Sequence, residues 1–196
     1  ADLVKLAAML PKRALLVVDE AYVDFAEPLD VFTMLPHFGA IPNLVILRTF
    51  SKMYGLAGLR LGYGIMPEWL ADLLLRVKLP FSVNILAEQA GLAALEDDLF
   101  VSETLRTVSE GRSLLERELS ALGCKVWPSQ ANFLMFEPPM DARALFEALL
   151  ERGIIIRPLA SYGMPGKLRV SIGNEEENLE FLAKTAEVLR DNHRHS

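Results

Sequence analysis

Cysteine is nearly absent from this sequence, since its 196 residues include a single thiol, Cys124. One cysteine excludes a disulfide framework and a cysteine-based metal site, and it favours a reducing, cytoplasmic compartment. Basic residues are outnumbered by acidic ones, and the formal net charge of -6 argues against a nucleic-acid partner. No apolar run approaches the roughly 18 residues that a membrane span needs. These absences leave a globular protein for which neither a nucleic acid nor a membrane is expected as a partner.

Several well-known catalytic motifs are missing too. The sequence contains no GxxxxGK[ST], no GxGxxG opening a helix, no HExxH and no GxSxG. It has only three histidines, which leaves little material for a Ser/His/Asp triad. The acidic run at 175–177 fits the first turn of a helix, so no metal site is expected there or elsewhere.

The pattern of apolar residues predicts an α/β protein. The run ALLVV at 14–18 is continuously apolar, which is typical of a strand buried on both faces of a parallel sheet, and LVILR at 44–48 predicts a second buried strand. RLGYGI at 60–65 predicts a third strand. Helical periodicity and capping residues predict long helices at 67–77, 84–95 and 99–122. Shorter elements follow, with strands at 131–137, 153–157 and 167–173, a helix at 141–153 and a last helix from 174.

The change from long to short elements divides the chain into two parts. We expect part of a mostly parallel α/β sheet domain with a connecting helix at residues 1–96, and a small α+β domain at 97–196. The helix capped by Asp141 is expected to bury Ala144, Leu145, Ala148 and Leu149. The last helix, capped by Asn174, is expected to bury Leu179, Leu182, Ala186 and Leu189.

The beginning of the sequence also carries information. It starts without Met in a helical pattern, ADLVKLAAML, that leads directly into a buried strand. A helix in that place is normally the second half of a strand–helix–strand crossover. We therefore expect the chain to be a portion of a longer one.

Charged side chains at the ends of the two apolar strands are the main candidates for chemistry. Asp19 follows the run at 14–18, and Lys52 follows the run at 44–48 after a short turn. In open α/β sheets, ligands bind at the carboxyl ends of the strands. Burial disfavours both charges, so each needs compensation from its surroundings. A lysine amine in such surroundings is a nucleophile toward aldehydes, and a carboxylate beside it is suited to a protonated ring nitrogen.

The segment after Lys52 adds a group suited to phosphate. Arg60, together with the hydroxyls of Thr49 and Ser51, is suited to clamp a phosphate dianion through charge-assisted hydrogen bonds. Gly55 and Gly58 would let the backbone approach that group closely. An aldehyde, a ring nitrogen and a phosphate together describe pyridoxal 5'-phosphate, whose usual protein partners include a lysine and an aspartate.

At these residues the sequence resembles the histidinol-phosphate aminotransferase family. The segments that carry the resemblance are DEAYVDF at 19–25, LRTFSKMYGLAGLRLGYGI at 47–65, ANFLMF at 131–136, and GIIIRPL with LRVSIG at 153–159 and 168–173. The similarity runs over essentially the whole chain. The strand–Ser–Lys–x5–GLRxG segment is specific for the superfamily, and DEAY with the later segments favours this subfamily.

The resemblance implies a fold-type I, pyridoxal-phosphate-dependent aminotransferase of histidine biosynthesis that acts as a homodimer on small-molecule amino and 2-oxo acids. The implied reaction converts histidinol phosphate and 2-oxoglutarate to imidazole acetol phosphate and glutamate. By position, the resemblance implies that Lys52 bonds the cofactor aldehyde and later moves the substrate proton. Asp19 would pair with the ring nitrogen, and Tyr22 would bond the ring hydroxyl. The cofactor phosphate would be held by Thr49, Ser51 and Arg60.

Substrate binding is implied for residues near the end of the chain. Arg169 and Arg157 would bind a substrate carboxylate, and Asn132 lies where the family places a residue facing the site. The family also has upstream features that this sequence lacks, including a phosphate-binding turn, an aromatic residue over the ring and an arm reaching the neighbouring subunit. The alternatives are a threonine-phosphate decarboxylase or an aromatic aminotransferase of the same superfamily, or a truncated, non-catalytic fragment.

Overall fold

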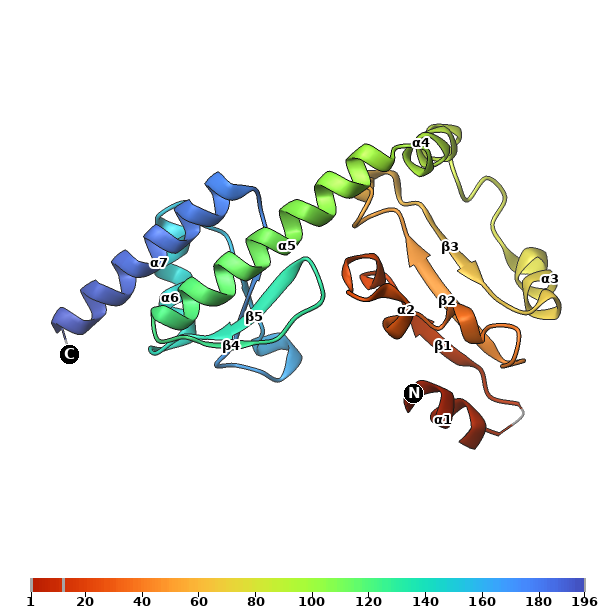
Figure 1. The fold of residues 1–196 in the computed structure, drawn as a ribbon, viewed down its shortest axis with the longest axis horizontal. Coiled ribbons are helices and arrows are strands. Elements are labelled where there is room, and N and C mark those ends of the chain that lie inside the picture. Colours follow the sequence, from red (N-terminus) through yellow and green to blue (C-terminus); the bar gives the residue numbers. More distant parts are fainter. Residues whose placement is uncertain (1, 12, 196) are drawn as a thin grey trace. The chain divides into compact units, whose positions relative to one another are not determined.

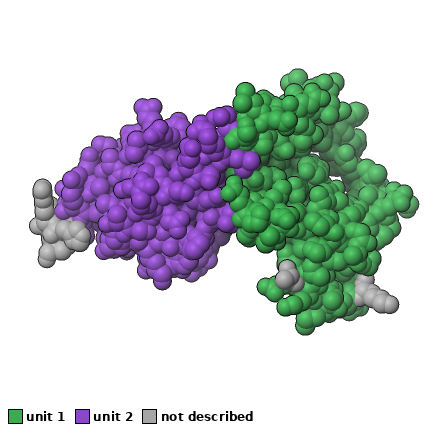
Figure 2. All heavy atoms as spheres, viewed as in Figure 1, with its two compact units in different colours: residues 1–102 green, residues 103–196 purple. Residues whose placement is uncertain are grey.

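The computed structural model describes residues 2–11 and 13–195 and divides into two compact units, residues 1–102 and 103–196 (Figure 2). Each unit has a sheet of its own. The change from the first unit to the second falls within the helix α5 (Asp98–Ala121), a few residues after the boundary expected at 96.

The sheet of the first unit has three strands in the order β1-β2-β3 (Figure 1). β1 (Leu16–Asp19) runs parallel to β2 (Leu44–Thr49), and β3 (Gly62–Ile65) runs antiparallel to β2. The three predicted strands are confirmed, but the sheet is mixed rather than mostly parallel. The reason is that the connection between β2 and β3 holds only a short 3-10 turn, η3 (Ala57–Leu59), and a parallel return would need a crossover helix.

One face of this sheet is covered, whereas the other, called the open face below, is exposed along β1 but buried at Val45 of β2, which is 4% exposed. The helix α1 (Asp2–Met9) and the segment 34–41 pack on the covered face, where Leu16, Leu44 and Ile46 are buried. On the opposite face Val17 is 53% exposed and Leu47 is 38% exposed. The expectation that the first strand is buried on both faces is therefore wrong, because no described element packs over Val17.

Helices and turns complete the first unit. The predicted helices after Pro67 and Asn84 are confirmed as α3 (Glu68–Val77) and α4 (Ile85–Leu95). Asn84 caps α4, since its side-chain oxygen accepts a hydrogen bond from Ala87 N at 2.8 Å. The segment between β1 and β2 holds three short pieces, η1 (Val23–Phe25), α2 (Leu29–Phe32) and η2 (Leu35–His37).

The second unit is a four-stranded antiparallel sheet with three helices. The strand order is β4-β5-β7-β6, with β4 (Lys125–Trp127), β5 (Phe133–Glu137), β6 (Arg157–Pro158) and β7 (Leu168–Ser171). A short turn, η4 (Ala160–Tyr162), lies between β6 and β7. α5, α6 (Ala142–Glu151) and α7 (Glu175–His195) share one core with Leu134, Phe136, Leu168 and Val170. Because strand side chains alternate, Phe133, Met135 and Arg169 lie on the face away from this core.

The capping predictions in the second unit are confirmed, and some of the burial predictions are wrong. Asp141 accepts a hydrogen bond from Ala144 N at 2.9 Å, and α6 is followed by Gly153 with a φ of 81°. Ala144 and Leu179 are exposed, because α6 turns Ala142 and α7 turns Phe181 toward the core, beside the expected Leu145, Leu149, Leu182 and Leu189. Of the run 153–157 only its last residue enters a strand, and the three-residue β4 was not predicted.

Two features bear on the absences noted in the sequence. Cys124 is buried, and burial raises the pKa of its thiol to about 11, so it stays protonated at neutral pH. Among the described residues, no helix combines the length and apolar character needed to cross a membrane.

Candidate active site

The carboxyl ends of β1 and β2 lie side by side because the two strands are parallel. Asp19 ends β1, pairs in register with Leu47 and lies on the open face of the sheet. One of its side-chain oxygens accepts a hydrogen bond from Ala21 N at 3.0 Å, which shapes the turn after the strand. Asp19 is exposed, so the expectation of a buried carboxylate is wrong. Its carboxylate is accessible to a ligand on the open face.

Lys52 and Tyr22 come together on the turns that follow these strands. Lys52 is half-buried, and its Nζ lies 5.2 Å from the centroid of the Tyr22 ring. The contact restricts the lysine side chain and shields part of the ammonium from water. The structure therefore brings together the residue expected to bond the cofactor aldehyde and the one expected to bond the ring hydroxyl.

The loop after β2 gathers the three groups expected to hold phosphate. Thr49 Oγ1 accepts a hydrogen bond from Ser51 N at 3.0 Å. Arg60 lies 3.5 Å from Ser51 Oγ through Nη1, and the same nitrogen donates to the Ala57 carbonyl at 2.7 Å. Arg60 also has a left-handed φ of 54°, which is unfavourable for a residue with a Cβ. Such a backbone persists only where the surrounding loop imposes it, and it is a common mark of a functional position.

The two glycines of this loop differ in what the backbone requires. Gly55 has a φ of 65°, a conformation that glycine adopts without a steric penalty. A Cβ on Gly58 would meet no described atom within 4 Å. The structure thus supports a conformational need for glycine at position 55 but not a steric one at position 58.

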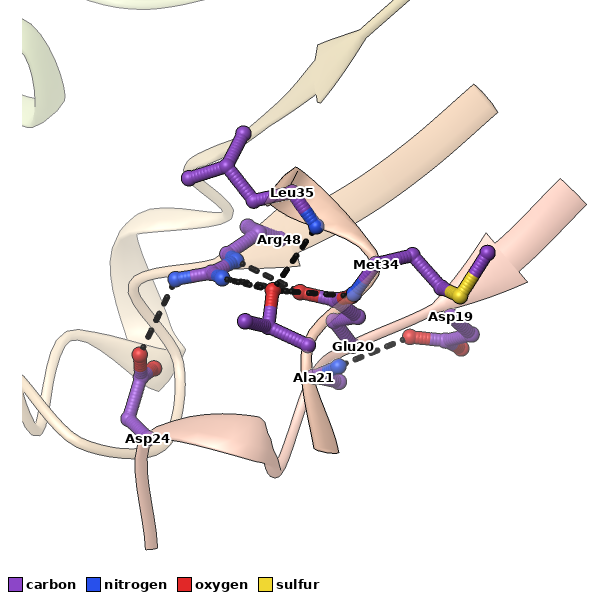
Figure 3. A network of polar contacts seen from close by, with 8 residues as sticks. Asp19, Glu20, Ala21, Asp24, Met34, Leu35 and Arg48 are labelled. Atoms are coloured by element: carbon purple, nitrogen blue, oxygen red, sulfur yellow. Dashed lines mark hydrogen bonds and ion pairs between the residues drawn. The ribbon is translucent and has the colours of Figure 1, made fainter. Parts of the chain in front are cut away.

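A buried ion pair between Glu20 and Arg48 was not identified from the sequence (Figure 3). Glu20 is 4% exposed, and one of its oxygens lies 2.8 Å from Arg48 Nη2. Arg48 also lies 3.3 Å from Asp24. Burial raises the pKa of the Asp24 carboxyl, with the charge of Arg48 opposing the rise and that of Glu20 adding to it. An arginine inside an apolar strand was the available signal, but its partner lies 28 residues away and is identified only by the strand register.

In the second unit, two arginines stand directly opposite each other. Arg157 on β6 pairs in register with Arg169 on β7, so both side chains lie on the face away from the core. Like charges in this arrangement repel, and an anion between them would remove the repulsion. The Nε of Arg169 is buried and has no hydrogen-bond partner among the described residues. A buried donor without a partner is costly, so this one is suited to an acceptor supplied by a ligand.

Aromatic residues hold these arginines in place. The Arg169 guanidinium lies 4.9 Å from the centroid of Phe133, and Arg157 donates to the Tyr162 hydroxyl at 2.9 Å. Tyr162 was missed in the sequence because its role depends on the η4 turn. Asn132 immediately precedes Phe133, is half-buried, and accepts a hydrogen bond from Ile172 N at its backbone carbonyl. Its side chain has no assigned role in the structure.

The sequence matches the family described as Aminotransferase class I and II over residues 1–185. The chain belongs to this family. It is 61% identical over 188 residues to a histidinol-phosphate aminotransferase of Nitratidesulfovibrio vulgaris (strain DP4), a match that covers 96% of this chain and 50% of that protein. The resemblance expected from the sequence is confirmed, and the chain spans about half the length of the curated relatives it matches.

Solved structures place this aminotransferase-family chain in the same fold. A histidinol-phosphate aminotransferase from Sinorhizobium meliloti in complex with pyridoxal-5'-phosphate is similar with a TM-score of 0.89 and 31% identity, over 97% of this chain and 53% of that one. A decarboxylase from Sulfurospirillum multivorans is similar with a TM-score of 0.82 and 29% identity, over 95% of this chain and 55% of that one. The expected fold class, an α/β part of a fold-type I transferase, is confirmed.

The donor set in the first unit fits pyridoxal 5'-phosphate. Lys52 offers an amine for the aldehyde, and Asp19 offers a carboxylate for the ring nitrogen. The contact between Ser51 and Arg60 brings together a hydroxyl and a guanidinium that are suited to bind phosphate. Within the part of the chain that the structure describes, no group of three or more His, Cys, Asp or Glu side chains is arranged to hold a metal ion.

Proposed function

We propose that the protein transfers amino groups with pyridoxal 5'-phosphate, converting histidinol phosphate and 2-oxoglutarate to imidazole acetol phosphate and glutamate. The observation that carries the proposal is the position of Lys52, half-buried against Tyr22 and one residue from the Ser51–Arg60 contact. An amine nucleophile beside groups suited to phosphate, at the carboxyl end of a strand, supports the proposal of a pyridoxal-phosphate enzyme.

Each cofactor-binding residue has a distinct role in this proposal. The cofactor, when bound, supplies an electron sink for the bonds of the substrate α-carbon. Lys52 Nζ would hold the cofactor through its aldehyde, and once the substrate amine has displaced it, the freed amine would carry the proton removed from the α-carbon. Asp19 keeps the ring nitrogen protonated through its negative charge, and Tyr22 orients the ring through its hydroxyl. The phosphate is anchored by Thr49, Ser51 and Arg60.

The substrate anion is assigned to Arg157 and Arg169, with Asn132 as an accessory residue. Histidinol phosphate carries a phosphate and no carboxylate, whereas glutamate carries two carboxylates. Planar guanidinium groups bond either anion in a bidentate manner. Two arginines on one sheet face, one of them with a buried Nε lacking a partner, therefore suit a protein that alternates between these substrates.

A second candidate function is decarboxylation of a phosphorylated amino acid such as threonine phosphate. The similarity to a decarboxylase of known structure supports it. Decarboxylation would use the same cofactor and the same anion-binding arginines. The two reactions differ in which bond of the α-carbon breaks, and the protein groups around the cofactor select that bond. An aromatic aminotransferase and a non-catalytic fragment are the remaining alternatives.

A substrate panel tests these proposals. The protein with added pyridoxal phosphate and 2-oxoglutarate is divided into parallel reactions. Each reaction contains one amino substrate, which is histidinol phosphate, threonine phosphate or an aromatic amino acid. We expect glutamate to form fastest with histidinol phosphate and no carbon dioxide to be released from threonine phosphate. Release of carbon dioxide would favour the decarboxylase, and no product from any substrate would favour the non-catalytic fragment. The Lys52→Ala variant serves as the inactive control.

The cellular compartment and the oligomeric state are further parts of the proposal. We propose a cytoplasmic enzyme, since a single buried thiol suits a reducing compartment. We also propose a homodimer, on the strength of the family resemblance.

A further inference from the structure

Asp19 and Glu20 are adjacent in the sequence but lie on opposite faces of the first sheet. Neighbouring residues along a strand alternate between faces, and Glu20 N continues the parallel ladder by donating to Leu47 O at 2.9 Å. Asp19 is therefore on the open face and Glu20 on the covered one, where it is 4% exposed. The same alternation separates Thr49 from Arg48. Each cofactor-binding residue of these strands thus has a charged neighbour on the reverse face.

The Glu20 carboxylate is fully occupied on that reverse face (Figure 3). It accepts hydrogen bonds from Thr33 Oγ1 at 2.9 Å and from Met34 N at 2.6 Å. It also accepts from Arg48 through Nε at 3.1 Å and Nη2 at 2.8 Å. Four donors on one buried carboxylate leave it little freedom to move.

Arg48 extends the network to a third segment. It donates to Asp24 at 3.3 Å and to Thr33 Oγ1 at 3.0 Å, in addition to its two bonds to Glu20. Glu20 and Asp24 lie on either side of Tyr22 in the chain, and Arg48 immediately precedes Thr49. The planar guanidinium therefore fixes the segment of Asp19 and Tyr22 against the segment of Thr49 and Lys52.

We infer that Glu20, Thr33 and Arg48 are positioning residues that set the spacing between the Asp19–Tyr22 segment and the Thr49–Lys52 segment for the cofactor. The inference rests on the proposed function. A buried ion pair often adds little to stability compared with well-packed apolar side chains, so a gain in stability alone does not explain it. What the network provides is geometry. The planar guanidinium donates to one oxygen of Glu20 through Nε and Nη2 and to Asp24 through Nη1, and contacts from three nitrogens constrain both distance and orientation.

The test compares variants in the protein at its natural length. Arg48→Met removes the guanidinium but keeps an unbranched side chain, and Thr33→Val removes one hydroxyl while leaving the Glu20–Arg48 pair intact. Arg48→Lys retains the charge without the planar fork. The matched control is Arg106→Met, which removes an exposed arginine paired with Glu103 and Glu110 in the second unit.

Two readouts separate positioning from general destabilisation. The first is amide hydrogen exchange in the cofactor-free protein at Glu20 N and Ser51 N, compared with Leu16 N at the opposite end of β1. The second is the dissociation constant for pyridoxal phosphate, measured by its change in absorbance. We expect Arg48→Met to accelerate exchange at the first two amides roughly tenfold, with little change at Leu16, and to weaken cofactor binding about 10- to 100-fold. Arg48→Lys should recover part of both effects, Thr33→Val should show smaller changes of the same sign, and Arg106→Met should show neither.

Uniform acceleration at all three amides would overturn the inference, since it would indicate general destabilisation. Unchanged exchange and cofactor affinity in Arg48→Met and Thr33→Val would overturn it as well. If Arg48→Met does not fold, Thr33→Val and Arg48→Lys decide the question. Failure of the unsubstituted protein to bind pyridoxal phosphate would contradict the proposed function instead. The hydrogen-exchange comparison, which needs no cofactor, would still test whether the network fixes the two segments.

Discussion

Asp19 and Arg169 act on different parts of the proposed reaction, so their substitution should have different kinetic effects. Asp19→Asn keeps an oxygen that can accept from Ala21 N, but it removes the charge that holds the ring nitrogen protonated. We expect kcat to fall roughly 100-fold or more with little change in KM. Arg169→Ala removes the proposed substrate anchor, so KM should rise, with a loss of about 2 to 5 kcal/mol of binding free energy. Steady-state kinetics with both substrates measures this, and small, equal effects from both variants would contradict these roles.

Arg60 combines an unfavourable backbone conformation with a side chain that is proposed to bind the cofactor phosphate. Its φ of 54° favours glycine, so Arg60→Gly should be more stable than Arg60→Ala by about 1 kcal/mol. Both variants lose the guanidinium that reaches Ser51, and both should bind pyridoxal phosphate more weakly. Denaturant unfolding of the cofactor-free protein and cofactor titration test the two statements separately. Equal stability of the two variants would argue against strain, and unchanged affinity would argue against a phosphate contact.

For individual residues, the sequence predicted the candidate site residues at the strand ends but not the ion pair on the opposite face of the sheet. Lys52 and Tyr22 were assigned from motif positions, and the structure brings them together. Glu20 and Arg48 were overlooked because a contact across 28 residues depends on strand register, which a single sequence does not reveal. The exposure of Asp19 was also missed, since an apolar run does not show which face of its strand is covered.

Among the elements, the cap of α6 offers a clean test. The Asp141 side chain accepts from Ala144 N at the helix start. Asp141→Ala should lower the free energy of unfolding of the second unit by about 1 kcal/mol, whereas Asp141→Asn should retain most of the cap. Thermal or denaturant unfolding followed by circular dichroism measures the difference. Equal stability of the two variants would show that the hydrogen bond from Ala144 N to residue 141 does not contribute to the stability of the second unit.

Long helices were predicted well because both their periodicity and their caps are local. Pro67, Asn84, Asp141 and Gly153 all lie at helix ends as expected. Short strands were predicted poorly, since β4 has three residues and β6 has two, and their existence depends on pairing with distant strands. The antiparallel direction of β3 likewise follows from a short connection, and the apolar pattern alone does not encode it.

For the whole molecule, exposed apolar residues between 69 and 100 are the feature with the broadest consequence. Val77 and Leu79 are each 76% exposed, and Phe81 is 99% exposed. Monomeric proteins rarely leave so many apolar side chains in water, and this chain spans about half the length of its relatives. We expect the isolated 196-residue chain to self-associate and to bind a hydrophobic dye. Light scattering and dye fluorescence measure both, and a monodisperse monomer without dye binding would contradict the expectation.

The central claim is that Lys52 is the residue that bonds pyridoxal phosphate. Borohydride reduction of the cofactor-loaded protein, followed by peptide mapping, fixes the cofactor on the lysine that held it. The account predicts one adduct, on the peptide containing Lys52, and its loss in Lys52→Arg, which keeps the charge but offers no amine nucleophile. An adduct on Lys78 or Lys125 instead, or an undiminished adduct in Lys52→Arg, would contradict it.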